Sequence, residues 1–144
     1  MADFAQYIGI PFKEKGRDPQ GFDCWGICRE ILSTVFHIDV PSYTEDYVTT
    51  KEGSEISALI GCESLGWSEV TLSHAQPGDV LVLRMRGRPW HCALFIDPPW
   101  FIHADPKAGV VRERWDSIIW EKRISEIYRH PLQVERVAVG STVQ

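Results

Sequence analysis

Residues 21–28, Gly-Phe-Asp-Cys-Trp-Gly-Ile-Cys, end a polar loop and begin a segment with helical apolar periodicity. The apolar stripe consists of Cys24, Cys28, Ile31, Leu32 and Val35. Asp23 directly precedes this stripe and is a natural N-cap, because its carboxylate accepts hydrogen bonds from the free N–H groups of a helix start. We therefore expect a helix from Cys24 to about His37, with Cys24 in the first turn and facing the interior.

The position of Cys24 has a chemical consequence. The positive end of a helix dipole favours a thiolate over a thiol, so the sequence predicts a lowered pKa for Cys24. Cys28 lies a turn further in, and Cys62 lies near the end of another expected helix, where the dipole disfavours a thiolate. Cys92 is expected to point away from His91. Cys24 is therefore the candidate nucleophile, and it needs a base and an orienting group.

Composition and charge exclude several classes of function. The chain has 144 residues, 44% of them hydrophobic and 24% charged, which is an ordinary balance for a soluble domain with a real core. A net charge of −5 argues against a general nucleic-acid or anionic-membrane binder. No apolar run approaches the roughly 18 residues that span a bilayer. The first residues lack the basic start and apolar stretch of a signal peptide.

These features predict synthesis in the cytoplasm, with export inside a larger particle left open. The four cysteines are then expected to be free thiols. No Cys-x-x-Cys pair is present, and a zinc site built from Cys24, Cys28 and His91 lacks a closely spaced second pair of ligands. We expect no metal and no cofactor.

The first half of the chain is expected to be helical. A short helix or turn over residues 3–12 precedes a polar loop over 13–22 and the Cys24 helix. Further helical segments are expected over 44–48 and from 53 to about 66, with Ile56, Leu59 and Ile60 facing inward.

The second half is expected to form strands separated by tight turns. The expected strands are 80–83, 91–96, 100–104, a strand starting at 110, and 124–128, with one helical turn over 115–120. Consecutive short strands imply an antiparallel meander. The predicted fold class is α+β, with N-terminal helices packed on an antiparallel β-sheet. We expect the chain to form one domain over residues 1–132, followed by a loose tail over 133–144.

Two histidines are placed to serve Cys24. His91 opens one strand, and His103 follows 12 residues later in the next strand. Alternation puts His91, Ala93 and Phe95 on one face, and we expect the Cys24 helix to pack there and bring its thiol to His91. His103 would then hold the other ring nitrogen of His91 and fix its tautomer. This gives a nucleophile, a base and an orienting group.

Four motifs, in this order, resemble those of a known family. They are Gly-Phe-Asp-Cys-Trp-Gly at 21–26, Gln-Pro-Gly-Asp-Val at 76–80, His-Cys-Ala-Leu-Phe-Ile at 91–96 and Phe-Ile-His-Ala at 101–104. The chain resembles the NlpC/p60 cell-wall cysteine peptidases over about residues 7–130. The resemblance implies a papain-like fold, with Cys24 as nucleophile, His91 as general base and His103 as the third member.

The resemblance also implies a substrate and a setting. Enzymes of this family cut peptidoglycan stem peptides, commonly at γ-D-glutamyl–diamino acid bonds. The short chain and its Asp-Cys-Trp-Gly variant look most like the phage and prophage tail-associated branch. Phage tail proteins are then expected partners, and the virion tail an expected location.

Two positions depart from the family pattern. Phe12 stands where the family usually has a tyrosine whose hydroxyl lies near the nucleophile, so Tyr7 and Arg17 are candidates to replace that donor. Trp25 stands where many members have serine, and its ring is expected to reshape the pocket. The expected substrate-binding residues are Asp23, Trp25, Phe12, Tyr7 and Arg17.

Two other functions stay open at this stage. The chain is alternatively a structural or assembly component of a phage tail, in which Phe12 and Trp25 mark a decay of catalysis. A different acyl transfer on the same scaffold, such as deamidation or transpeptidation, is the third reading, which only the products distinguish. For Asp23, the alternative to substrate binding is a purely structural role as the cap of the helix.

Overall fold

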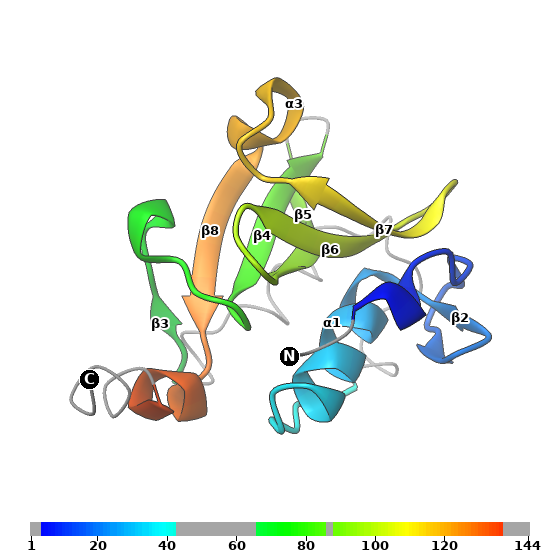
Figure 1. The fold of residues 1–144 in the computed structure, drawn as a ribbon, viewed down its shortest axis with the longest axis horizontal. Coiled ribbons are helices and arrows are strands. Elements are labelled where there is room, and N and C mark those ends of the chain that lie inside the picture. The colour runs from blue at the N-terminus through cyan, green and yellow to red at the C-terminus, as the bar shows by residue number, and fades with distance from the viewer. Residues whose placement is uncertain (1–3, 43–65, 86–87, 137–144) are drawn as a thin grey trace.

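A computed structural model describes residues 4–42, 66–85 and 88–136 of the chain (Figure 1). A curved antiparallel sheet makes up most of it, and the N-terminal helix α1 lies beside the sheet (Figure 1). The architecture is α+β, as predicted. The helical segments expected over 44–48 and after residue 53, together with Cys62, lie outside the described residues. Within the described part, no helix has the length and apolar character needed to cross a membrane.

The N-terminal segment leads into α1 through short elements. They are the 3-10 helix η1 (Ala5–Tyr7), strands β1 (Arg17–Asp18) and β2 (Gly21–Phe22), and α1 (Cys24–Thr34). The loop predicted over 13–22 thus contains a small antiparallel hairpin. Helix α1 ends three residues before His37, whose φ of 57° is incompatible with a right-handed helix.

Six strands form the main sheet, in the order β3-β8-β4-β5-β6-β7. They are β3 (Ser68–Glu69), β4 (Val80–Met85), β5 (Arg88–Phe95), β6 (Trp100–Asp105), β7 (Gly109–Arg114) and β8 (Ile124–Arg129). Strands β4 to β7 form the predicted meander, with antiparallel neighbours. Two short helices, η3 (Leu72–His74) and α3 (Ile118–Glu121), flank them.

The position of the last strand differs from the predicted meander. Strand β8 does not follow β7 in the sheet but returns to pair with β4. A buried ion pair accompanies this return: Arg129 of β8 donates from Nε to Asp79 Oδ1 at 2.9 Å and from Nη2 to Oδ2 at 2.8 Å. Asp79 immediately precedes β4 and has no exposed surface, so its charge needs this partner.

The prediction of a loose tail over residues 133–144 is wrong for its first part. Residues 131–136 are helical. Gln133 is buried and donates to the carbonyl of Pro77 at 3.2 Å, which attaches this helix to the turn before β4. Residues 137–144 lie outside the described chain.

Helix α1 packs on the opposite face of the sheet from the one expected. Its stripe shares a core with Cys92, Leu94 and Ile96. Ala93 and Phe95 belong instead to the core on the other face, with Phe101 and Trp120. The first row is apolar throughout, whereas the second row begins with His91. Packing α1 on the row of Cys92, Leu94 and Ile96 therefore buries apolar surface against apolar surface.

Candidate active site

Asp23 fixes the start of α1. It is fully buried, and its Oδ1 accepts a hydrogen bond from Gly26 N at 2.8 Å. The same oxygen pairs with Arg17 Nη1 at 2.7 Å, and Oδ2 accepts from Lys15 N at 3.1 Å. The predicted N-cap is confirmed. One carboxylate thus ties the preceding loop to the first helical turn and sets the position of Cys24.

Gly26 allows that loop to close over the helix. A Cβ at this position would lie 2.1 Å from the carbonyl oxygen of Gly16, far closer than van der Waals contact. The glycine two residues after Cys24 therefore has a steric reason in the fold.

The thiol of Cys24 is enclosed. Only 1% of the residue is exposed, and both Cys92 and His91 act on the pKa of its thiol. Cys92 and burial raise the pKa of Cys24 well above its ordinary value, and His91 opposes them without prevailing. The predicted lowering of this pKa is wrong, because burial and a neighbouring thiol outweigh the helix dipole. Cys92 lies on the opposite face of β5 from the row that begins with His91, as expected, but that face is the one that α1 covers, so Cys92 shares a core with Cys24.

Strands β5 and β6 separate next to Cys24. Their pairing consists of Leu94 with Ile102 and Phe95 with Phe101, although both strands extend beyond these pairs. Two imidazoles lie past the paired region. His91 Nε2 lies 2.9 Å from His103 Nδ1, with the rings nearly perpendicular. Both histidines are buried, at 8% and 1% exposure, so this hydrogen bond is shielded from water.

The other nitrogen of His103 has a partner that the sequence did not predict. His103 Nε2 lies 2.6 Å from Oε2 of Glu113 on β7. The hydrogen bond to His103 lowers the pKa of Glu113. A signal for this contact exists in the hairpin: Val111 is the register partner of His103, and Glu113 lies two residues further on the same face. The contacts run from Cys24 through His91 and His103 to Glu113.

Two of the residues expected to bind substrate are fixed by structural contacts. Trp25 is buried, and its indole Nε1 donates to the carbonyl of Pro41 at 2.8 Å. Arg17 pairs with Asp23 and also donates to Oγ and the carbonyl of Ser42. These contacts hold residues 41–42 and the loop before α1 against the start of the helix.

Tyr7 and Phe12, the other two residues expected to bind substrate, do not take part in these contacts around the start of α1. Burial raises the pKa of the Tyr7 hydroxyl, and Thr34 and Glu30 also act on it. Both of these residues lie in the second half of α1, toward the end opposite Cys24. Phe12 is half-buried and forms an isolated parallel bridge with Phe22. The structure thus brings Cys24, His91 and His103 together and leaves the Tyr7 hydroxyl apart from them.

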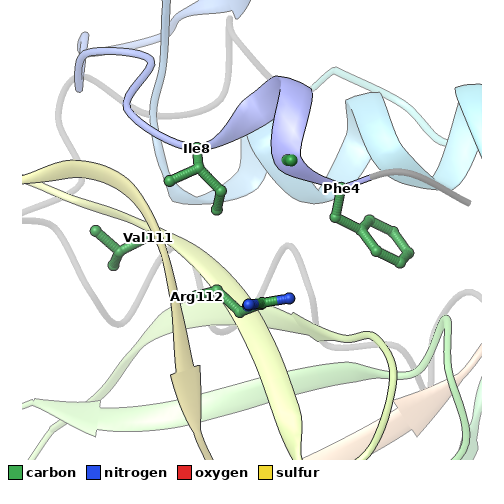
Figure 2. A pocket seen from close by; sticks show the side chains of 5 residues that line it. Phe4, Ile8, Val111 and Arg112 are labelled. Carbon is green, nitrogen blue, oxygen red and sulfur yellow. The ribbon is translucent and has the colours of Figure 1, made fainter.

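A separate hollow of about 320 Å³ lies between the η1 segment and β7 (Figure 2). Its lining residues are Phe4, Ala5, Ile8, Val111 and Arg112. Neither the Cys24 thiol nor the two histidines border it. Over the described ranges, no cluster of three or more His, Cys, Asp or Glu side chains is arranged to hold a metal ion.

Comparison with known proteins identifies the family. The profile described as "NlpC/P60 family" matches residues 9–129, which is most of the chain and includes all three residues of the candidate site. This chain belongs to the NlpC/P60 family.

Two curated relatives extend the comparison. The chain is 23% identical over 129 residues to the murein DD-endopeptidase MepS/murein LD-carboxypeptidase of Escherichia coli K12, covering 90% of this chain and 60% of that protein. It is 29% identical over 109 residues to tail tip assembly protein K of Escherichia phage lambda, covering 75% and 53%. The chain therefore spans little more than half of the length of these two NlpC/P60 relatives.

A solved structure supports the fold. The NlpC/p60 domain of the peptidoglycan hydrolase SagA is similar with a TM-score of 0.58 and 24% identity. The likeness covers 88% of this chain and 92% of that domain. The α+β arrangement described above is thus the NlpC/P60 fold, as the sequence predicted.

Proposed function

We propose that this NlpC/P60 chain is a cysteine peptidase that hydrolyses amide bonds in peptidoglycan stem peptides. The observation that carries the proposal is the buried Cys24 thiol at the start of α1, whose pKa His91 lowers, together with the hydrogen bond between His91 and His103. MepS, a relative named for cleaving murein, supports the class of substrate.

In this mechanism, Cys24 enters as a neutral thiol, in keeping with its raised pKa. His91 Nε2 is engaged by His103, so Nδ1 is the nitrogen left to accept the thiol proton. As that proton moves to His91, Sγ attacks the amide carbonyl carbon and forms a tetrahedral oxyanion. The imidazolium of His91 then protonates the leaving amine as the C–N bond breaks, which gives a thioester. Water, deprotonated by His91, attacks the thioester and releases the carboxylic acid and the thiol.

The backbone N–H of Cys24 is the proposed donor to the oxyanion. Cys24 is the first residue of α1, so its N–H has no partner within the helix. This donor replaces the tyrosine hydroxyl that Phe12 lacks and that Tyr7, placed near the other end of α1, does not supply.

The finer assignment concerns the bond and the setting. We propose the γ-D-glutamyl–diamino acid bond as the cleaved bond, on the resemblance of the four motifs to the family. The similarity to a tail tip assembly protein supports association with a phage tail and its proteins. In that setting the peptidase opens the cell wall during infection.

Digestion of purified peptidoglycan tests this function. Wild type and Cys24→Ala are incubated in parallel, and mass spectrometry identifies the products. Cleaved stem peptides from wild type alone establish a cysteine peptidase and name its bond. Amide loss or exchanged peptides in place of cleavage would assign deamidation or transpeptidation. Equal cleavage by Cys24→Ala would refute the role of Cys24.

A second candidate is a catalytically inactive component of a phage tail. It is favoured by the enclosure of the Cys24 thiol, which is 1% exposed with a raised pKa, and by the tail assembly relative. Alkylation with iodoacetamide separates the candidates. A working site alkylates at Cys24 faster than at Cys28 or Cys92, whereas an inactive tail component leaves all three unreactive while folded.

A further inference from the structure

Glu113 closes a continuous line of hydrogen bonds behind the candidate nucleophile. Its Oε2 lies 2.6 Å from His103 Nε2, and His103 Nδ1 lies 2.9 Å from His91 Nε2. Both imidazoles are buried, while the side chain of Glu113 is 36% exposed to solvent. The line therefore runs from the edge strand β7 through β6 to β5.

The carboxylate of Glu113 is held in place by a second contact. The Trp120 ring, on α3, packs edge-on against His103 with centroids 5.2 Å apart, and after His103 it is the other side chain whose interaction lowers the pKa of Glu113. Helix α3 lies in the connection between β7 and β8, above the start of β8 in the view of Figure 1. Trp120 is itself buried against Phe101, so Glu113 meets His103 from a fixed direction.

The neighbouring carboxylate of Asp105 does not take this role. Asp105 lies near both histidines, but its Oδ2 accepts from the backbone N–H groups of Lys107 and Ala108, at 2.9 and 2.8 Å. These contacts cap the β6–β7 turn. Its charge acts on His103 through space, without a hydrogen bond that selects one ring nitrogen.

The direction of each hydrogen bond follows from Glu113. An ionised carboxylate only accepts, so Nε2 of His103 must carry its proton. Neutral His103 then presents a lone pair at Nδ1, and Nε2 of His91 must donate to it. His91 is left with its lone pair on Nδ1, the nitrogen available to Cys24. With no carboxylate, His103 can adopt the opposite tautomer, which reverses His91 and leaves Nδ1 protonated and unable to accept.

We propose that Glu113 is a positioning residue that sets the tautomers of His103 and His91 so that His91 can act as a base toward Cys24. This inference rests on the peptidase function proposed above, and it adds a fourth residue that acts through His103.

The test uses the full chain with Glu113→Gln, Glu113→Ala and Glu113→Asp. Glu121→Gln is the matched control, because Glu121 is an exposed glutamate on the adjacent α3. Nitrogen-15 NMR of the imidazoles reports the tautomers at a pH where both histidines are neutral. Cleavage of a peptidoglycan stem peptide gives kcat and KM.

We expect wild type and Glu121→Gln to hold both histidines as Nε2–H tautomers. Glu113→Gln and Glu113→Ala lose that single state, and their kcat falls about 10- to 100-fold with KM changed less than about twofold. Glu113→Asp recovers part of both signals, which a loss of folding would not allow. Unchanged tautomers in Glu113→Gln and Glu113→Ala overturn the proposal, and so does an unchanged kcat. If wild type cleaves no stem peptide, the peptidase function fails, while the tautomer measurement still decides the role of Glu113.

Discussion

Cys24 of α1 and Cys92 of β5 are buried in the same core, and the Cys92 thiol raises the pKa of the Cys24 thiol. This effect of Cys92 is the largest cause of the raised pKa of Cys24, ahead of burial. The nucleophile candidate of this chain is therefore a protonated thiol at neutral pH, poised beside a base, rather than a preformed thiolate.

Replacing Cys92 should make Cys24 more acidic. In Cys92→Ala the thiol that raises the Cys24 pKa is gone, while His91, which lowers it, remains. The midpoint of the pH dependence of Cys24 alkylation should move to lower pH. Iodoacetamide labelling across pH, with the modified residue assigned by mass spectrometry, measures it. Cys28→Ala is the control and should leave the midpoint in place; an unmoved midpoint in Cys92→Ala would contradict the prediction.

The two histidines should differ in how much they contribute. His91→Ala removes the proposed base and should reduce kcat about 100- to 10,000-fold. His103→Ala removes only its orienting partner and should cost about 10- to 100-fold, leaving residual turnover. Steady-state cleavage of a stem peptide measures both. Wild-type kinetics in His103→Ala would remove it from the site, and unchanged turnover in His91→Ala would mean that another group is the base.

Gly26→Ala sets two effects against each other. Alanine favours a helix over glycine by about 1 kcal/mol. The added Cβ, however, would lie 2.1 Å from the backbone carbonyl of Gly16, which has no flexible end that could move aside. The clash should win and destabilise the fold by about 1–3 kcal/mol, with loss of activity as the loop shifts from Cys24. Urea unfolding measures the change. Ser33→Ala, at an exposed site on α1, is the control, and equal stability in the two variants would show that the loop yields freely.

The sequence predicted the elements that local patterns define. The Asp23 cap and the apolar stripe located the start of α1, and the alternation of apolar residues located β4 to β8. The 12-residue spacing brought His91 and His103 together, and their rings are in contact. These features depend on neighbours in sequence, which is why they could be predicted.

Features that depend on packing between distant segments were missed. The return of β8 to β4 brings together residues 50 apart in sequence, Asp79 and Arg129. Both faces of β5 are apolar beyond His91, so alternation alone did not decide which face α1 covers. The Cys92 contact and the raised pKa of Cys24 followed from that choice. Glu113 required the register of the β6–β7 hairpin.

Asp23 should be a structural residue first. Asp23→Ala loses the cap to Gly26 and the partner of Arg17, and it should destabilise the protein by about 1–2 kcal/mol for the cap alone. Asp23→Asn keeps an oxygen for the cap and should be less harmful. Thermal unfolding and KM are measured together. A raised KM in Asp23→Asn at unchanged stability would instead support the predicted role of Asp23 in binding substrate.

The Asp79–Arg129 pair should contribute to stability without acting in chemistry. Asp79→Ala removes both hydrogen bonds to the Arg129 guanidinium, whose pKa Asp79 raises, and leaves a buried cation without its carboxylate. The cost should be about 3–5 kcal/mol in urea unfolding. Asp116→Ala is the matched control, because it breaks the exposed Arg114–Asp116 pair. This change should have no detectable effect on stability. At temperatures where Asp79→Ala remains folded, its kcat should equal that of wild type, since the pair lies outside the contacts from Cys24 to Glu113. Equal stability of the two variants would mean that Arg129 finds another partner when Asp79 is absent.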